Sequence, residues 1–304
     1  MTAYVPVVDL SDDQDEIVND IRNACTNYGY FKVINHGIRS DVREGALSAG
    51  EDFFDLSEDE KMEYLSNDVE RPVRYGTGGG NLDGDVRSCR EFIKLYANPI
   101  EDYIEMWPDE PEGFRRRMRK YAKHVRRLAM TLAEAFTESL DLGSSHLTSQ
   151  MEDDGMHVIT VNGYPANDEP VLSLSAHSDY SIFTILLMNN PGLEVLDRDD
   201  DEWMSISECD GLLVLVGDHL EVLSNGRYRG VVHRAFYGGD ESRISIASFH
   251  SLPLYTKMKP APALVAEDNK KKYRSSSVQD FLEFLASANN ISGGDTYIES
   301  LRKY

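Results

Sequence analysis

The sequence predicts an α+β protein with a mainly β core, arranged as a double-sheet jelly roll. Two observations support this class. After residue 150, short segments rich in Val, Ile, Leu, Phe and Tyr follow one another between turn signals, a spacing typical of sandwiches and barrels and not of alternating βα units. One long amphipathic segment precedes them and helical segments follow. Among all-β folds, a jelly roll suits a chain that wraps a central pocket.

The N-terminal part predicts an α/β region. Residues 4–10, YVPVVDL, read as a short strand. A helix follows from Ser11, which can cap it, and acidic residues in its first turn suit the positive end of the helix dipole. Gly29 is expected to end that helix, and residues 30–38, YFKVINHGI, alternate as a second strand.

The chain then returns to helix over residues 41–66, with Phe53, Phe54 and Leu56 expected on the buried side. The next stretch, RYGTGGGNLDGD at residues 74–85, contains too much glycine for regular structure. We therefore expect a loop there, placed to cover a site.

Residues 111–142 predict one long supporting helix, closed by Gly143. Its apolar residues recur at three- and four-residue spacing: Phe114, Met118, Tyr121, Val125, Leu128, Leu132, Phe136 and Leu140. A final helix is expected at residues 277–288, and residues 295–304 are expected to pack back on the core.

The β segments of the core are HVITVNGYP, SLSAHSDYSIFTILLM, LEVLDRDDDEWMSI, LLVLVGDHLEVLSNG, VVHRAFYG and RISIASFHSLP. We expect four parts in the chain: an N-terminal region at 1–110, the supporting helix and linker at 111–150, the jelly-roll core at 151–265 and a helical cover at 266–304.

Composition narrows the possible partners. Lys and Arg number 31 against 53 Asp and Glu, a net charge of −22, which argues against nucleic acid or an anionic membrane surface. The three cysteines, Cys25, Cys89 and Cys209, are far apart and suggest neither a disulfide framework nor a zinc site. No leader or membrane span is apparent. We expect a cytoplasmic monomer.

One stretch, LSLSAHSDYSIFTILLM at residues 172–188, places His177 and Asp179 in an otherwise apolar or hydroxylic run. In an extended strand, residues i and i+2 point to the same face, so the imidazole and the carboxylate are expected to project together. Such a pair alone is weak evidence for a site.

His233 in VVHRAF, 54 residues beyond Asp179, supplies a third candidate ligand. Two histidines and one carboxylate on the inner faces of a barrel make a facial arrangement that leaves positions open on non-haem iron(II). A zinc hydrolase can use the same ligands, but the helical His-Glu-x-x-His pattern is absent from the sequence. The other histidines carry no expected role, and we expect His124, His146 and His157 to lie at the surface or to be partly buried.

Arg243 and Ser245 in RISIASF have the same parity and therefore share a strand face. Arginine offers a fixed, bidentate grip on a carboxylate, and serine adds one hydroxyl donor. An inward arginine among Ile244 and Ile246 is costly unless it meets an anion, whereas an outward one forms an ordinary surface pair.

Taken together, HSD, VVHRAF and RISIASF resemble the iron(II)- and 2-oxoglutarate-dependent dioxygenases of the isopenicillin N synthase-like superfamily, and most closely the soluble plant members that act on small molecules. GDHLEVLSNGRYRGVVHR, VPVVDL, YGYFKVINHGI and DFLEFLAS are also similar to that group. The resemblance covers nearly the whole chain and implies a double-stranded β-helix, a cupin-like jelly roll.

The resemblance implies that His177, Asp179 and His233 bind iron(II). It implies that Arg243 and Ser245 bind the distal carboxylate of 2-oxoglutarate, helped by Tyr164 and Asn162, and that Phe249 and Phe92 face the organic substrate. O2 would be the second co-substrate, ascorbate the reductant, and hydroxylation or desaturation of a phenolic, flavonoid, alkaloid or hormone-like metabolite the reaction, with release of succinate and CO2.

Two alternatives remain open at this stage. Isopenicillin N synthase and 1-aminocyclopropane-1-carboxylate oxidase resemble the same scaffold and keep the Arg-x-Ser pair without using 2-oxoglutarate, so Arg243 and Ser245 do not exclude an oxidase of that kind. The other alternative is a metal-free relative that only binds a small molecule. Such a relative is expected to lose a ligand, whereas all three candidates are present here.

Overall fold

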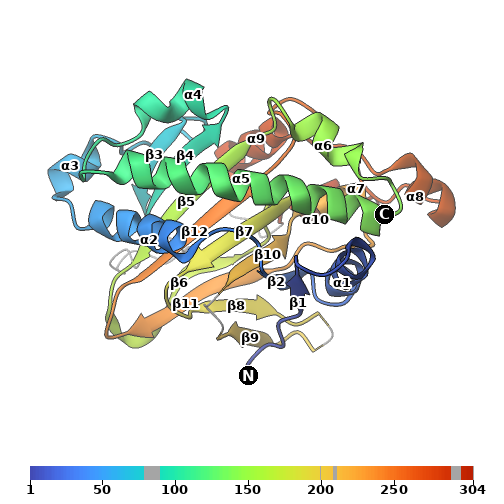
Figure 1. The fold of residues 1–304 in the computed structure, drawn as a ribbon, viewed down its shortest axis with the longest axis horizontal. Coiled ribbons are helices and arrows are strands. Elements are labelled where there is room, and N and C mark those ends of the chain that lie inside the picture. Colours follow the sequence, from blue (N-terminus) through green and yellow to red (C-terminus); the bar gives the residue numbers. More distant parts are fainter. Residues whose placement is uncertain (79–89, 199, 208–210, 289–295, 304) are drawn as a thin grey trace.

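The computed structural model of the chain describes residues 1–78, 90–198, 200–207, 211–288 and 296–303. Figure 1 shows two β-sheets and a long helix, α5 (Phe114–Ser139), that crosses one face of the larger sheet. The described part of the chain therefore has the mixed class and the layered β core that the sequence predicts.

Eight strands form the larger sheet, in the spatial order β1, β2, β10, β7, β12, β5, β4, β3. They are β1 (Val7–Asp9), β2 (Tyr30–Ile34), β3 (Val73–Thr77), β4 (Glu91–Asn98), β5 (His157–Tyr164), β7 (Phe183–Met188), β10 (Leu212–Val216) and β12 (Arg243–His250). Strands β1 and β2 pair in parallel, and the other neighbours are antiparallel.

Four strands form the smaller sheet, in the order β6, β11, β8, β9, and all its described pairs are antiparallel. They are β6 (Asn167–His177), β11 (His233–Gly239), β8 (Leu193–Leu196) and β9 (Trp203–Ile206). This sheet faces the side of the larger sheet that the helices leave open, which completes the two-sheet arrangement of a jelly roll.

The alternation of side chains explains why the larger sheet is covered on both faces. In β7, Ile185 and Leu187 belong to the core shared with the helices, whereas Leu186 and Met188 belong to the core between the two sheets. Because neighbouring residues of a strand point to opposite faces, a strand buried on both sides reads as a continuous apolar run. The run FTILLM is an example.

The helices are α1 (Gln14–Asn27), α2 (Ser40–Phe54), α3 (Glu58–Met62), α4 (Ile100–Tyr103), α5, α6 (Ser145–Met151), α7 (Asp218–Leu223), α8 (Pro262–Asp268), α9 (Val278–Ala288) and α10 (Tyr297–Leu301), with a 3₁₀ turn at Ile104–Met106. The predicted apolar stripe of α5 is buried along its length, from Phe114 to Phe136. It packs against α1, α2 and α6, so this helix supports the larger sheet as expected.

Helix boundaries differ from the prediction in two places. The side chain of Asp13, not Ser11, caps α1 by accepting the backbone N–H of Glu16. The predicted helix over residues 41–66 is divided, because Ser57 begins α3 with a capping box in which it exchanges hydrogen bonds with Glu60.

Two further segments differ from the prediction. The start of the glycine-rich stretch is strand β3, in which Gly76 lies under the ring of Phe92, where a Cβ atom would come within 2.7 Å of the ring. The remainder of that stretch, from residue 79, lies outside the described residues. Residues after Gly217 form the short helix α7 and not a strand, because β10 ends at Val216 and Gly217 turns the chain.

The prediction that His157 lies at the surface or is partly buried is wrong. His157 in β5 and His250 in β12 are completely buried, and their rings stack with centroids 4.4 Å apart. Among the described residues, neither ring has a hydrogen-bond partner. Burial, with the charge of Arg126 adding to it, lowers the pKa of His157 to about 3, and burial lowers the pKa of His250 well below its ordinary value.

We expect this pair to make stability fall with acid. Both folded-state pKa values lie below the unfolded value of about 6.5. The contribution of the two imidazoles to the free energy of unfolding is therefore fully present above that pH and declines below it. Well below pH 6.5 the slope approaches about 1.4 kcal/mol per pH unit for each imidazole, and between about pH 6.5 and 5.5 the loss is about 1 kcal/mol for each, or roughly 2 kcal/mol for both. Urea unfolding at these two pH values measures the loss. A His157→Phe variant should lose about 1 kcal/mol less over this interval than the parent protein, and an unchanged loss would contradict the assignment.

Candidate metal centre and its two chambers

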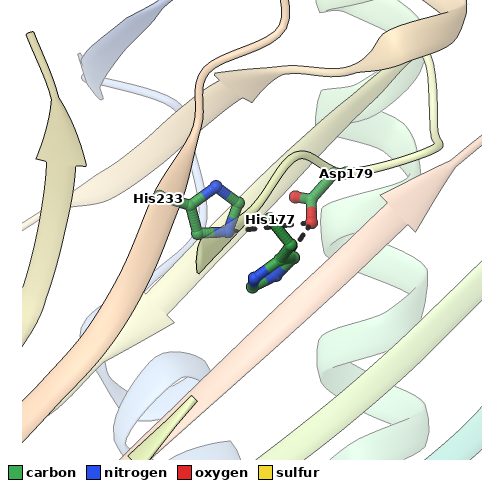
Figure 2. Close-up of side chains that lie close together, drawn as sticks. All are labelled: His177, Asp179 and His233. Atoms are coloured by element: carbon green, nitrogen blue, oxygen red, sulfur yellow. Dashed lines mark ion pairs between the residues drawn. The ribbon is translucent and has the colours of Figure 1, made fainter. Parts of the chain in front are cut away.

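His177, Asp179 and His233 converge between the two sheets. His177 ends β6 and His233 begins β11, and the two residues are paired directly across these strands. Asp179 lies in the turn after β6, so the turn, and not a continuous strand, brings its carboxylate beside the imidazoles. Its Oδ1 is 3.7 Å from the Nε2 atom of each histidine. Figure 2 marks these two contacts with dashed lines.

Local hydrogen bonds fix both rings. Nδ1 of His177 is 2.8 Å from the carbonyl oxygen of Ser175, and Nδ1 of His233 is 3.1 Å from that of Val231. An Nδ1–H that donates to a carbonyl leaves the lone pair on Nε2, the atom that faces the centre. Burial and the neighbouring His233 ring lower the pKa of His177 to about 4, so this imidazole is neutral and able to bind a metal at neutral pH.

Thr184 of β7 orients the carboxylate. Its hydroxyl donates to Oδ2 of Asp179 over 2.5 Å, which leaves Oδ1 directed at the two imidazoles. Both side chains are buried, with Asp179 5% exposed. Hydrogen-bonded partners of this kind hold metal ligands in position. The sequence analysis missed Thr184, although a lone hydroxyl in the apolar run FTILLM is a signal for such a role.

This donor set fits a ferrous ion. One ligand atom from each of the three residues lies within 4.8 Å of the other two. Neighbouring ligands of an octahedral ion at about 2.1 Å are roughly 3 Å apart, so the observed 3.7 Å separations need only a small inward shift. Two imidazoles and one carboxylate on one side leave positions open for further ligands.

A cavity of about 160 Å³ adjoins the triad and contains Arg243, so we name it the arginine chamber. Its lining residues include Arg90, Asn162, Tyr164, Leu174, His177, Asp179, Leu186, His233, Arg243, Ser245 and Phe249. Arg243 is 1% exposed; its Nε donates to the carbonyl of Asn190, and its Nη1 has no partner among the described residues. A buried guanidinium without a carboxylate needs an anion.

The other predicted co-substrate residues surround this guanidinium. Tyr164 is paired across the strands with Arg243, whose guanidinium lies 4.8 Å from the centre of the tyrosine ring. Asn162 is paired with Ser245 and donates to its hydroxyl over 3.3 Å. Arg90, which the sequence analysis missed, donates to Oδ1 of Asn162. The strand register thus brings all four predicted residues into one chamber.

A second cavity, of about 210 Å³, also reaches the triad, and we name it the aromatic chamber. It is lined by Val69, Arg74, Lys94, Tyr96, Met156, Val158, Thr160, His177, Ser178, Asp179, Tyr180, Phe249, Val278, Phe281, Leu282 and Leu285. Tyr180 lies between Phe249 and Phe281, with ring centroids 5.8 and 4.2 Å away.

The two phenylalanines predicted to face the substrate are placed differently. Phe249 lines both chambers, next to the triad. Phe92 lines neither; the guanidinium groups of Arg74 and Arg90 lie 4.9 and 4.7 Å from the centre of its ring, and the ring lines a separate hollow that shares Arg74, Lys94 and Thr160 with the wall of the aromatic chamber. Its role toward a substrate stays a prediction.

Comparison with known proteins agrees with this geometry. Residues 5–110 match the family model described as non-haem dioxygenase in morphine synthesis N-terminal, and residues 155–252 match the 2OG-Fe(II) oxygenase superfamily. In rice (Oryza sativa subsp. japonica), 2-oxoglutarate-dependent dioxygenase 21, chloroplastic, is 45% identical, with 94% of this chain and 85% of that protein covered. Flavanone 3-dioxygenase 3 from rice is 42% identical, with 98% and 93% covered.

Solved structures show the same fold. JOX2, crystallised with 2OG, Fe and JA, superposes with a TM-score of 0.88 at 25% identity, covering 100% of this chain and 90% of that one. The rice dioxygenase for auxin oxidation gives a TM-score of 0.81 at 23% identity, covering 99% and 100%. The double-stranded β-helix prediction is confirmed.

Fold and site together define a non-haem iron oxygenase. The chain belongs to the 2OG-Fe(II) oxygenase superfamily. It is a 2-oxoglutarate-dependent dioxygenase that uses iron(II) and acts on a small organic molecule. The alternatives of an oxidase that does not use 2-oxoglutarate and of a metal-free binding protein are set aside. No described helix is long and apolar enough to span a bilayer.

Proposed function

We propose that His177, Asp179 and His233 bind the iron(II) and that the arginine chamber holds 2-oxoglutarate, with its distal carboxylate on Arg243 and Ser245. The observation that carries this proposal is the pair of chambers that meet at one triad, one of which contains a buried guanidinium that forms no ion pair with a carboxylate of the described residues. Asn162 and Tyr164 complete the wall around the co-substrate.

The organic substrate occupies the aromatic chamber in this proposal. When bound there, iron and 2-oxoglutarate supply with O2 an oxidant able to take a hydrogen atom from a C–H bond, and the balance is substrate, O2 and 2-oxoglutarate giving hydroxylated product, succinate and CO2. The protein positions the reactants. Thr184 holds Asp179 so that Oδ1 faces the two imidazoles, and the rings of Tyr180 and Phe249 exclude water beside the triad.

The substrate class rests on the aromatic walls and on similar proteins. We propose hydroxylation, or desaturation, of a phenolic, flavonoid, alkaloid or hormone-like metabolite. Relatives named for a flavanone and for auxin oxidation support a small organic substrate, and stacked rings suit a ligand with an aromatic ring. Phe92, in the hollow next to Arg74, is the second substrate-facing position proposed.

We propose that the enzyme works as a monomer in the cytoplasm. The widely spaced cysteines, of which Cys25 is buried and free, suit a reducing compartment. The name of one similar rice protein includes the word chloroplastic. Imaging of a fluorescent fusion and sedimentation of the purified protein test location and assembly separately.

Strict dependence on 2-oxoglutarate is the expected result that tests the proposal. Oxygen uptake with a panel of plant-type metabolites should require added 2-oxoglutarate and produce an equal amount of succinate, with the product identified by its mass change. A metal chelator should stop the reaction, and added Fe(II) should restore it. Oxidation that proceeds without 2-oxoglutarate would contradict the proposal.

A further inference from the structure

The aromatic chamber contains two cations side by side. Arg74 of β3 and Lys94 of β4 are directly opposite each other in the strand pairing, and both line the chamber. The Lys94 side chain is buried, and Nε of Arg74 is buried without a hydrogen-bond partner among the described residues. Like charges directly opposite each other in antiparallel strands are destabilising. The pair is therefore not explained by a contribution to the stability of the fold.

No carboxylate among the described residues forms an ion pair with either cation. Nζ of Lys94 donates to the carbonyl of Val69 over 2.6 Å and lies 4.8 Å from the centre of the Tyr96 ring, and the Arg74 guanidinium lies over Phe92. The charge of another buried lysine, Lys61, is compensated in the usual way, by an ion pair with Glu91 at 3.2 Å. Arg74 and Lys94 form no direct ion pair of this kind among the described residues, and the charges of Asp68 and Glu70 compensate them only from a greater distance.

The acids nearest these cations, Asp68 and Glu70, favour the charged form of Lys94, and Asp68 favours that of Arg74, but neither acid forms an ion pair with them among the described residues. Asp179 is the one carboxylate among the described residues that line the chamber, and it belongs to the metal centre. Oδ1 of Asp68 accepts the backbone N–H of Glu70, and Oε1 of Glu70 accepts the side-chain N–H of Gln279. Burial, with the charge of Arg74 adding to it and those of Asp68 and Glu70 opposing it, lowers the pKa of Lys94 to about 7. The amine is therefore about half protonated at neutral pH, and an anion bound beside it would favour the charged form.

The rest of the chamber is shaped for an apolar ring. Its walls include the Phe249, Tyr180 and Phe281 stack together with Val158 and Leu282. An engineered apolar cavity of about 150 Å³ binds benzene, so about 210 Å³ accommodates an aromatic ring with a short substituent. The chamber therefore combines a ring site, a cationic site and access to the triad.

We propose that the substrate is an aromatic carboxylic acid whose carboxylate is bound by Arg74 and Lys94 while its ring lies against Tyr180 and Phe249. The inference rests on the proposed function, because it assigns the substrate class of the same site. It adds a second anion site, separate from the guanidinium of Arg243, and it distinguishes this chain from an enzyme selective for uncharged polyphenols. In this proposal the two cations orient the ring so that one edge faces the metal centre.

Paired acids and amides provide the test. Protein loaded with Fe(II) and 2-oxoglutarate is titrated anaerobically, by calorimetry, with benzoic, hydroxybenzoic, cinnamic and coumaric acids and with the primary amide of each. The acid that binds best should bind at least about 10-fold more tightly than its amide, as expected for hydrogen bonds to charged groups. Lys94→Met and Arg74→Met should each remove most of that preference, whereas Lys120→Met, an exposed lysine on α5, should leave it unchanged.

The outcomes separate this inference from the proposed function. Both chamber variants should remain folded, because each removes a buried charge, and thermal unfolding checks this. Acids and amides that bind equally, acids that do not bind, or a preference that survives both substitutions would overturn the inference while leaving 2-oxoglutarate turnover intact. A protein that keeps the acid preference but never converts 2-oxoglutarate would instead contradict the proposed function.

Discussion

Replacing His233 with alanine is expected to abolish iron binding and turnover while leaving the fold in place. The imidazole supplies one of three ligand atoms, and its Nδ1–H is held by a single backbone carbonyl two residues away. Changes to residues that merely orient a ligand cost about 10- to 100-fold in metal affinity, so loss of a ligand itself should exceed about 100-fold. Anaerobic equilibrium dialysis with Fe(II) measures the affinity, and succinate release measures the turnover.

The matched control for this variant is His124→Ala. His124 lies on α5, and its Nδ1 contacts the carbonyl of Lys120 in the preceding turn. This substitution should leave iron affinity and turnover unchanged, and circular dichroism should show both variants folded. An active His233→Ala protein, with its iron affinity intact, would show that the metal assignment is wrong.

Replacing Arg243 with methionine is expected to raise the KM for 2-oxoglutarate by about 100-fold or more. Hydrogen bonds to charged groups contribute about 1.5–3 kcal/mol each, so two from a guanidinium to a carboxylate give roughly 3–6 kcal/mol, or about 10²- to 10⁴-fold. Steady-state kinetics with varied 2-oxoglutarate give this value. Arg243→Lys keeps the positive charge but loses the planar guanidinium that binds a carboxylate through two hydrogen bonds, so an intermediate KM for 2-oxoglutarate is expected.

The stability of the ligand-free protein provides an independent readout. Arg243 is almost completely buried and has no ion-pair partner among the described residues. Its removal should therefore leave the thermal midpoint no lower than that of the parent protein. Arg227→Met, at the exposed pair with Glu267, is the control and should leave the KM unchanged. A large stability loss with an unaltered KM would give Arg243 a purely structural role.

Strand parity predicted that Arg243 and Ser245 share one face, whereas the resemblance to the dioxygenases supplied the roles of the remaining site residues. In β12, Arg243, Ser245 and Phe249 face the chambers, whereas Ile244 and Ile246 belong to the core under the helices. A period of two suffices for this distinction, because a side chain in a strand has only two faces to choose from. The same rule, extended along REFIKLY, places Arg90, Phe92, Lys94 and Tyr96 on one face. The sequence analysis used only Phe92 from that set.

Other features depend on contacts that parity cannot supply. The opposition of Arg74 and Lys94 requires the register of β3 against β4, and the His157–His250 stack requires the register of β5 against β12. Asp179 presents its carboxylate from a turn, where the strand rule does not apply. The register between strands that are distant in sequence depends on the whole fold. The sequence of the individual strands therefore does not predict which of these residues become neighbours.

The triad joins the two sheets. His177 and His233 extend from the smaller sheet, whereas Thr184 of β7, which holds Asp179, and Arg243 of β12 belong to the larger one. Ligands bound between these groups contact both sheets, and a ligand that binds only the folded protein adds about 2.7 kcal/mol to its stability at about 100 times its Kd. The loaded protein is therefore expected to resist thermal unfolding better than the ligand-free protein.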